Sequence, residues 1–454
     1  MATRKKGSFW TFADRFEGDK VVWIIVLLLF LISIVCMFSS TSRLLSKGAT
    51  RLDVVKEQLV VVAAGLGLII LLYNIRSMKF FRVCSSLGFG LSLVLLLLLD
   101  CRIDIQHVLE AKEINGAFRV LNVADKVQIH VFEIVKVAMV MYLAWAIDMF
   151  KHKRLPGKSL SEIWQKIIFI YLPFLIVFVM ILLGSNSSAI IVGGIMFIVI
   201  LLGGGNFRDM SLLLLSGIVV IGICTGIYKL SDGKAMKRIG TGISRIFEDE
   251  DLEKKFLESK RGTVEYQDAL DAMRQPYSAK IAVHEGGLLG KGPGQSTQRY
   301  MVPDYSEDYM YSFIIEEYGL LGGILVIFIY ISLLARGSII VRGCGNDLYA
   351  KLSVAGLCIL ISGQAFLHMF VNADIGPMTG QTLPLVSHGT SAFLCFCIAF
   401  GIILSFSRIA ARRIEKETRE AAPLVEMHDN VEAGLNELDA FESGTMSNEE
   451  DYGI

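Results

Sequence analysis

Residues 21–38 read VVWIIVLLLFLISIVCMF, a run of 18 residues without a charged side chain. An apolar run of this length can cross the hydrocarbon core of a bilayer as a helix. It follows a basic N-terminal segment, residues 1–20, and no small-residue cleavage pattern comes after it. The sequence therefore predicts a retained first membrane span preceded by a short cytoplasmic segment.

The whole chain repeats this character. Of its 454 residues 53% are hydrophobic and only 19% are charged, which is too apolar for a soluble globular domain. The net charge is zero, so no basic field indicates a nucleic-acid partner. The predicted fold is an all-α polytopic membrane protein of about ten transmembrane helices. Their apolar stretches begin near Val21, Gln58, Phe80, Glu133, Ile167, Ser187, Ser211, Tyr309, Ser353 and Leu383.

Basic residues between these stretches indicate the topology. With the N-terminus in the cytoplasm, the clusters that fall inside are Arg76, Lys79, Arg82, Lys151, Lys153, Arg154, Arg208, Arg336, Arg342, Arg408, Arg412 and Arg413. Both termini are then cytoplasmic, with a transmembrane domain over 21–408. Segments 101–132 and 229–308 lie outside, the second as a large extracytoplasmic loop between helices 7 and 8. The acidic tail 409–454 has few apolar residues and is predicted to be disordered.

A glycine-rich segment lies near the end of the large loop, where residues 290–296 read GKGPGQS, and Asp308 directly precedes the next apolar helix. A carboxylate beside hydrocarbon is costly unless it faces protein, water or a substrate, so Asp308 is a functional candidate. Glycine lacks a Cβ and allows a bulky polar headgroup to approach the backbone. The alternative for Asp308 is a helix cap that satisfies free backbone amides.

A second candidate segment, residues 372–382, interrupts two apolar stretches with helix-breaking residues. Irregular backbone at this depth is tolerated only where protein buries it or where it lines a cavity, so it is expected to form a second wall of the site. Glu316 and Glu317, about two turns into a helix, are expected to form a structural ion pair. Glu133 and Lys136 are three residues apart on one helix face and are expected to pair with each other.

These segments together resemble the SEDS family (shape, elongation, division and sporulation), which includes FtsW and RodA. The similar stretches are 115–119 NGAFR, Glu133 with Lys136, 290–299 GKGPGQSTQR, 302–304 VPD, 307–309 EDY, 315–319 IEEYG and 377–391 PMTGQTLPLVSHGTS. The chain departs from the family at Val120, which replaces a Trp, at Val131-Phe132, which replace Pro-Ser, and at His388-Gly389-Thr390, which replace Tyr-Gly-Gly. The QTLPL wording favours the FtsW branch, and a RodA-like elongation role remains open.

The resemblance implies a peptidoglycan glycosyltransferase that joins lipid II into a lipid-linked glycan strand at the outer face of the bacterial cytoplasmic (inner) membrane. For the division branch it implies work at the septum, beside a single-pass class B penicillin-binding transpeptidase and other division proteins. Asp308 is then the catalytic general base, which takes a proton from the attacking sugar hydroxyl. A single inverting displacement needs no second catalytic carboxylate.

The leaving pyrophosphate requires positive charge. The substrate-binding candidates that follow from the resemblance are Arg119, Lys136, Lys291, Gly292, Gly294, Ser296, Gln298, Arg299, Thr379, Ser387 and Ser391. For Ser387 and Ser391 the alternative is a hydrogen bond to helix backbone. No cofactor is evident and no His/Cys cluster has metal-ligand spacing, so the one metal considered is a divalent cation bound through the substrate pyrophosphate.

Two other functions remain as alternatives. A lipid II flippase would also suit about ten helices with a broken segment, but inverted repeats should then relate the two halves, and none is evident. A non-catalytic divisome scaffold would act through the outer loop and the acidic tail, and it predicts that Asp308 is dispensable.

Overall fold

The computed structural model describes most of the membrane region. The described residues are 17–40, 51–105, 109–114, 117–123, 127–155, 161–230, 256–259, 261, 263–301, 305–376 and 379–449. Several predicted features therefore lie outside the described residues: most of the N-terminal segment, the centre of the large loop, and the motif residues Asn115, Gly116, 302–304, Pro377 and Met378.

Helices occupy the ten apolar stretches. They are α2 (Lys20–Ser40), α4 (Arg51–Asn74), α5 (Met78–Asp100), α6 (Val131–Lys151), α7 (Glu162–Lys166) continuing through the π-helical turn η1 (Ile167–Tyr171) into α8 (Leu172–Gly184), α9 (Asn186–Leu202), α10 (Phe207–Leu230), α15 (Met310–Gly343), α16 (Leu348–Asn372) and α17 (Thr390–Glu449). Within the described residues, 8 helices are long and apolar enough to cross a membrane, and α9 is a shorter apolar helix. The prediction of a helical polytopic membrane protein is confirmed, while the count of ten spans stays a prediction.

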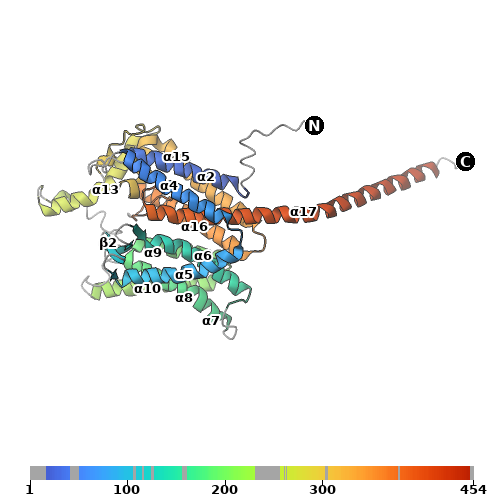
Figure 1. The fold of residues 1–454 in the computed structure, drawn as a ribbon, viewed down its shortest axis with the longest axis horizontal. Coiled ribbons are helices and arrows are strands. Elements are labelled where there is room, and N and C mark those ends of the chain that lie inside the picture. The colour runs from blue at the N-terminus through green and yellow to red at the C-terminus, as the bar shows by residue number, and fades with distance from the viewer. Residues whose placement is uncertain are drawn as a thin grey trace.

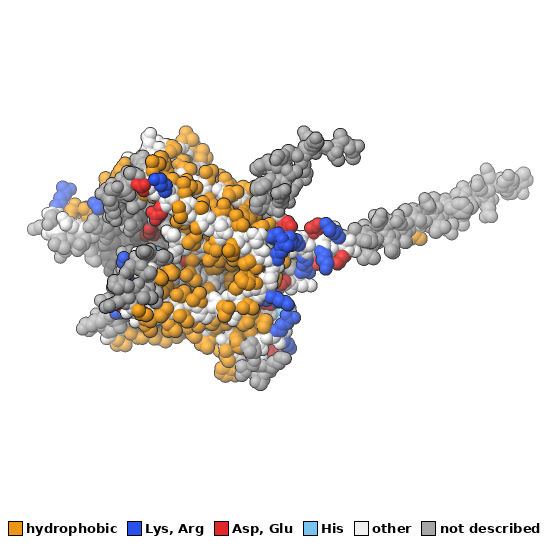
Figure 2. Space-filling model, viewed as in Figure 1, with side chains coloured by type: hydrophobic (Ala, Val, Ile, Leu, Met, Phe, Trp, Pro, Cys, Tyr) orange, Lys and Arg blue, Asp and Glu red, His pale blue; other side chains and the backbone are white. Residues whose placement is uncertain are grey.

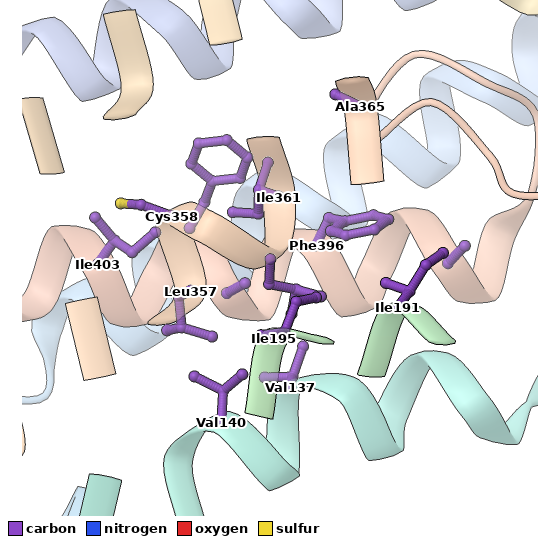
Figure 3. Close-up of a cluster of buried hydrophobic side chains, with 14 of the residues drawn as sticks. Val137, Val140, Ile191, Ile195, Leu357, Cys358, Ile361, Ala365, Phe396 and Ile403 are labelled. Atoms are coloured by element: carbon purple, nitrogen blue, oxygen red, sulfur yellow. The ribbon is translucent and has the colours of Figure 1, made fainter. Parts of the chain in front are cut away.

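Helix α16 lies at the centre of the bundle, where it packs against α6, α9, α15 and α17. Figure 3 shows the interdigitated side chains, with Val140 from α6, Ile195 from α9 and Phe396 from α17 around Leu357 of α16. A Cβ on Gly356 would lie 2.6 Å from Val140 Cγ1, so α16 approaches α6 closely because this position has no side chain. Such dense packing fixes the helices that carry the site.

The two ends of the bundle differ (Figure 1). Strand β2 and helix α13 (Val264–Gly286) lie at one end, and α17 extends from the other. Figure 2 shows hydrophobic side chains on the flank of the bundle and Lys and Arg side chains gathered near the end from which α17 extends. This separation agrees with the topology expected from the basic clusters, in which segments 101–132 and 229–308 share the outer side.

A small sheet was not predicted. Strands β1 (Asp104–Ile105), β2 (Leu109–Ile114), β3 (Ala117–Val123) and β4 (Val127–His130) form an antiparallel sheet in the order β1-β2-β3-β4. The sheet lies between α5 and α6 in the chain, and its last strand, β4, is followed directly by α6. The outer strands β1 and β4, of 2 and 4 residues, have little sequence signal of their own, and a small sheet depends on pairing and on the neighbouring helices for its stability.

The tail also differs from expectation. Residues 409–449, expected to be disordered, continue α17 as a helix. Ion pairs at i,i+4 spacing, Arg413 with Glu417 at 2.7 Å and Arg419 with Glu415 at 2.7 Å, stabilise its first turns beyond the bundle. An acidic composition prevents burial in a core, but Glu, Arg and Ala have high helix propensity.

Candidate functional site

Asp308 is the last residue of the short helix α14 (Tyr305–Asp308), which precedes α15. The backbone of α14 is held by hydrogen bonds from the segment that follows α16. The N–H of His388 donates to the carbonyl of Ser306 at 3.0 Å, and Ser387 Oγ donates to the carbonyl of Glu307 at 2.8 Å. Asn372 Nδ2 donates to the carbonyl of Asp308 itself at 3.2 Å. The aspartate is therefore positioned through its backbone, and its side chain is half-buried.

The irregular segment after α16 runs beside this carboxylate. Gly380 has a φ of 60°, and a Cβ built there would lie 3.8 Å from Asp308 Oδ2. The expected second wall of the site is thus next to Asp308. The N-cap position of α15 is Tyr309, which directly follows Asp308.

Lys136 lies beneath this segment and is buried. Its Nζ donates to Glu133 Oε1 at 2.6 Å, to Gln364 Oε1 at 2.8 Å and to Gln381 Oε1 at 2.8 Å. The predicted pairing of Glu133 with Lys136 is confirmed. An ammonium group has three protons, and each has an acceptor here. Lys136 therefore holds Gln381 in place, and its role in binding substrate stays a prediction.

Gln381 is fixed from two further sides. His368 Nε2 accepts the N–H of Tyr311 at 3.3 Å, so the ring carries its proton on Nδ1, which donates to the carbonyl of Gln381 at 2.6 Å. Gln381 Nε2 donates to Ser188 Oγ at 3.2 Å. Side chains from α6, α9 and α16 thus fix the residue next to Gly380, and through it the wall beside Asp308.

Charged groups from three elements meet around His130, at the end of β4. Burial lowers the pKa of His130, and the charges of Lys136 and Arg119 lower it further, while Glu133 and Glu307 oppose them. Ser391 Oγ accepts the N–H of His130 at 3.0 Å. Arg119, half-buried on β3, therefore belongs to the same part of the molecule as Lys136 and Glu307.

The glycine-rich loop packs against α15. Its side chains and amides fold onto Glu316 and Glu317 of α15, both buried. Lys291 Nζ donates to Glu316 Oε1 at 2.9 Å, to Thr297 Oγ1 at 2.8 Å and to Glu285. Although burial lowers the pKa of Lys291, its hydrogen bonds to Glu285 and Glu316 outweigh that effect and raise it. The expected structural ion pairing of the two glutamates is confirmed.

Other loop residues predicted to bind substrate contact the same two glutamates or the neighbouring Ser39. Ser296 Oγ donates to Glu316, and the N–H of Gln298 donates to Glu316 Oε1 at 3.3 Å. Arg299 Nη1 donates to the carbonyl of Ser39 at 2.7 Å and lies 3.9 Å from Glu317 Oε1. The N–H of Gly294 donates to Ser39 Oγ at 2.9 Å.

The loop backbone is fitted to a break in α15. Gly319, inside this helix, has a φ of 71°, and a Cβ there would lie 2.3 Å from the carbonyl oxygen of Leu288. The N–H of Lys291 donates to the carbonyl of Glu316 at 2.9 Å, and that of Gly292 to the carbonyl of Glu317 at 3.0 Å. The loop glycines therefore permit close packing of protein on protein.

The structure thus divides the predicted residues into two groups. Around Asp308 and His130 it gathers Arg119, Lys136, Ser387, Ser391 and the segment that contains Thr379. Around Glu316 and Glu317 it gathers Lys291, Gly292, Gly294, Ser296, Gln298 and Arg299. Sequence reasoning missed Gln364, His368 and Gln381, whose polar side chains within apolar helices or at helix breaks were the available signal.

The chain is similar to known proteins in sequence and in fold. A family model described as "Cell cycle protein", FTSW_RODA_SPOVE, matches residues 19–412. The chain belongs to the FtsW, RodA and SpoVE family. A "Probable peptidoglycan glycosyltransferase FtsW" of Caulobacter vibrioides is 35% identical to this chain over 130 residues, which make up 29% of this chain and 33% of the relative. Stage V sporulation protein E of Bacillus subtilis is 34% identical over 144 residues, 32% of this chain and 39% of the relative.

The aligned segments thus span little more than a third of the length of these family members. Over nearly the whole chain, the fold is similar to solved structures. A chain from "Structural coordination of polymerization and crosslinking by a peptidoglycan synthase complex" superposes with a TM-score of 0.61 at 21% identity, covering 87% of this chain and 98% of that one. The rod shape determining protein RodA of Thermus thermophilus superposes with a TM-score of 0.56 at 21% identity, covering 86% and 97%. Both show that the family fold is present.

Proposed function

We propose that this protein is a peptidoglycan glycosyltransferase that polymerises lipid II at the outer face of the bacterial inner membrane. The observation that carries the proposal is Asp308, half-buried at the outer end of the bundle, with its backbone tied to the segment after α16 and its carboxylate beside Gly380. The names of the relatives support the same reaction, and the FtsW names favour a role in septal synthesis.

In the proposed reaction, Asp308 accepts the proton of the acceptor sugar hydroxyl. The hydroxyl oxygen forms a bond to the anomeric carbon of the lipid-linked donor, and the bond from that carbon to the pyrophosphate oxygen breaks with inversion. One carboxylate is sufficient for this displacement, because no covalent glycosyl intermediate has to form. A base on a short helix outside the apolar part of α15 remains accessible to the headgroup.

The leaving pyrophosphate gains negative charge, which the site has to balance. We assign Arg119 to the phosphate, because its charge acts on His130 together with those of Lys136 and Glu307, and Glu307 directly precedes Asp308. Among the described residues there is no group of three or more His, Cys, Asp or Glu able to hold a metal. We therefore propose that any divalent cation arrives with the substrate pyrophosphate.

The proposed partners are lipid II, the growing lipid-linked strand and a class B penicillin-binding transpeptidase. The likeness to a chain from a peptidoglycan synthase complex supports the last of these. The deciding experiment measures polymerisation of purified lipid II by the protein with its transpeptidase, comparing wild type with Asp308→Asn. Asp374→Asn is the matched control, since Asp374 follows α16 at the outer end and pairs with Lys280 at 2.8 Å.

The proposal expects no polymer from Asp308→Asn and wild-type polymer from Asp374→Asn, with both variants melting at the wild-type temperature. Equal polymerisation by wild type and Asp308→Asn would contradict the general-base assignment and favour a scaffold.

A further inference from the structure

A histidine and a glutamate form a pair next to the catalytic aspartate. His388 Nδ1 lies 3.4 Å from Glu307 Oε1, and Glu307 directly precedes Asp308. The side chain of His388 is 28% exposed and that of Glu307 47% exposed, so water reaches both. These residues are 81 positions apart in the chain. The pair therefore joins the segment after α16 to the helix that carries Asp308.

The same two residues are joined through their backbones and neighbours. The N–H of His388 donates to the carbonyl of Ser306 at 3.0 Å, and Ser387 Oγ donates to the carbonyl of Glu307 at 2.8 Å. A helix of four residues has too few internal hydrogen bonds to hold itself, so these external bonds determine where α14 lies. Of the two ionisable side chains in this set, the imidazole of His388 is the type that ordinarily titrates near neutral pH.

We propose that protonated His388 pairs with Glu307 and thereby positions α14 and Asp308, so that polymerisation declines as His388 loses its proton. This inference rests on the proposed polymerase function. His388 and Glu307 act here as positioning residues, while the proton of the sugar hydroxyl passes to Asp308.

The charges around the ring favour its protonated form. Glu307 of α14 raises the pKa of His388 through the hydrogen bond and through its charge, Glu57 of α4 raises it further, and burial opposes them. Among the described residues, these two carboxylates are the charged groups that act on the ring from the elements packed against it. Glu307 in turn acts on His130 of β4, whose pKa burial lowers. The pKa of His130 is thus lowered, whereas that of His388 is raised.

The direction of the pH effect follows from this shift. A histidine whose pKa is raised in the folded protein contributes its pairing fully below its ordinary value of 6.5 and loses it as the pH rises through the raised value. The decline in activity accordingly lies on the alkaline side. Loss of a half-exposed ion pair is expected to lower the polymerisation rate by about two- to fivefold.

The test measures initial rates of lipid II polymerisation by the protein with its transpeptidase from pH 6 to 9. The rate of the wild-type protein is expected to fall about two- to fivefold on the alkaline side, the size expected for a half-exposed ion pair. His388→Gln, which has no titratable ring, is expected to show a lower rate at pH 6 and no alkaline decline. Glu307→Gln is likewise expected to show a lower rate at pH 6 and no alkaline decline, since the neutral amide cannot form the ion pair with the imidazolium.

A matched control removes another imidazole at the same end of the molecule. His284 is exposed on α13, outside the site, and His284→Gln is expected to retain the wild-type rate and profile. An alkaline decline in His388→Gln equal to that of wild type would overturn the inference. The same holds if Glu307→Gln keeps the wild-type alkaline decline.

A second measurement is independent of activity. The protein labelled at histidine in lipid nanodiscs is titrated by NMR, with the His388 signal assigned by its loss in His388→Gln. A His388 pKa that lies above the ordinary histidine value in wild type and is lower in Glu307→Gln supports the pair. The same His388 pKa in both proteins refutes it. If wild type makes no polymer at any pH, the proposed function fails, and this titration alone decides whether the pair exists.

Discussion

Lys136→Met tests whether the ammonium group at the centre of the bundle holds the site together. The substitution keeps an unbranched side chain of similar length and removes the cation. It leaves two buried amide oxygens, of Gln364 and Gln381, and the carboxylate of Glu133 without their shared donor. The Lys136 side chain is 1% exposed and that of Glu133 13% exposed, so water does not replace the lost bonds freely.

The expected cost is about 3–5 kcal/mol in the free energy of unfolding, the range for breaking a buried ion pair by removing one partner. Glu133→Gln should cost less, because the lysine keeps neutral acceptors. The double variant Lys136→Met, Glu133→Gln should be more stable than the sum of the two losses predicts, since no buried charge is left unpaired. The coupling between the two residues is therefore expected to be large and favourable.

The measurement is equilibrium unfolding in mixed micelles of increasing denaturing-detergent content, with Lys112→Met, at an exposed position on β2, as the matched control. Wild-type stability of Lys136→Met, or losses that simply add in the double variant, would refute the structural role of the ammonium group. A stable variant that still loses polymerisation would instead indicate direct contact with substrate.

Three further predictions concern the loop, the cytoplasmic end and the substrate. Gly319→Ala should destabilise the protein by about 2–4 kcal/mol, because φ is 71° there and the added Cβ would meet the carbonyl of Leu288. Gly194→Ala, which has open space around its Cβ, should be neutral or slightly stabilising. Thermal unfolding measures both effects. Hydrogen bonds from Arg412, first, and Arg408 lower the pKa of Glu17 from 4.5 to about 2, so the stability that this carboxylate contributes is present above pH 4.5 and is lost as the pH falls toward 2. Melting curves should show that loss for wild type and a smaller one for Glu17→Gln, and an equal loss in both would contradict the assignment. If a divalent cation arrives with the pyrophosphate, chelation should lower the polymerisation rate and leave the melting temperature unchanged, and a chelator that lowers both would indicate a cation held by the protein.

The parts of the fold set by local sequence were predictable. Apolar stretches such as 21–38 are long enough to require a spanning helix whatever their neighbours, and α2 covers this one. Pairing of Glu133 with Lys136 followed from i,i+3 spacing on one helix face. The sheet was not predicted, because a strand of two or four residues depends on partners that periodicity within the strand does not identify.

The long-range contacts of the site could not be predicted from spacing. Lys136 meets Gln381 across 245 positions, and His388 meets Glu307 across 81. Lys291 and Arg299 of the glycine-rich loop were predicted to bind a phosphate because they are positively charged. Glu316 and Glu317 were correctly expected to form ion pairs, but the sequence did not identify these two cations as their partners. Charge identifies what a residue can bind, while only the fold decides which of several anions it reaches.

The carboxylates of Asp308 and of Glu316 and Glu317 lie close together in sequence but have opposite surroundings. Glu316 and Glu317 are buried, and loop 287–299 directs Lys291, Arg299 and several N–H groups at them. This loop cannot leave α15 without exposing two charges to an apolar bundle, which is costly. Its cations therefore maintain the fold. For the proposed reaction we assign the positive charge at the leaving pyrophosphate to the other group of residues, around Arg119, near Asp308 on its short helix. The two glutamates are thus buried and paired with the loop, whereas the aspartate proposed as the general base is half-buried and lies beside a different segment.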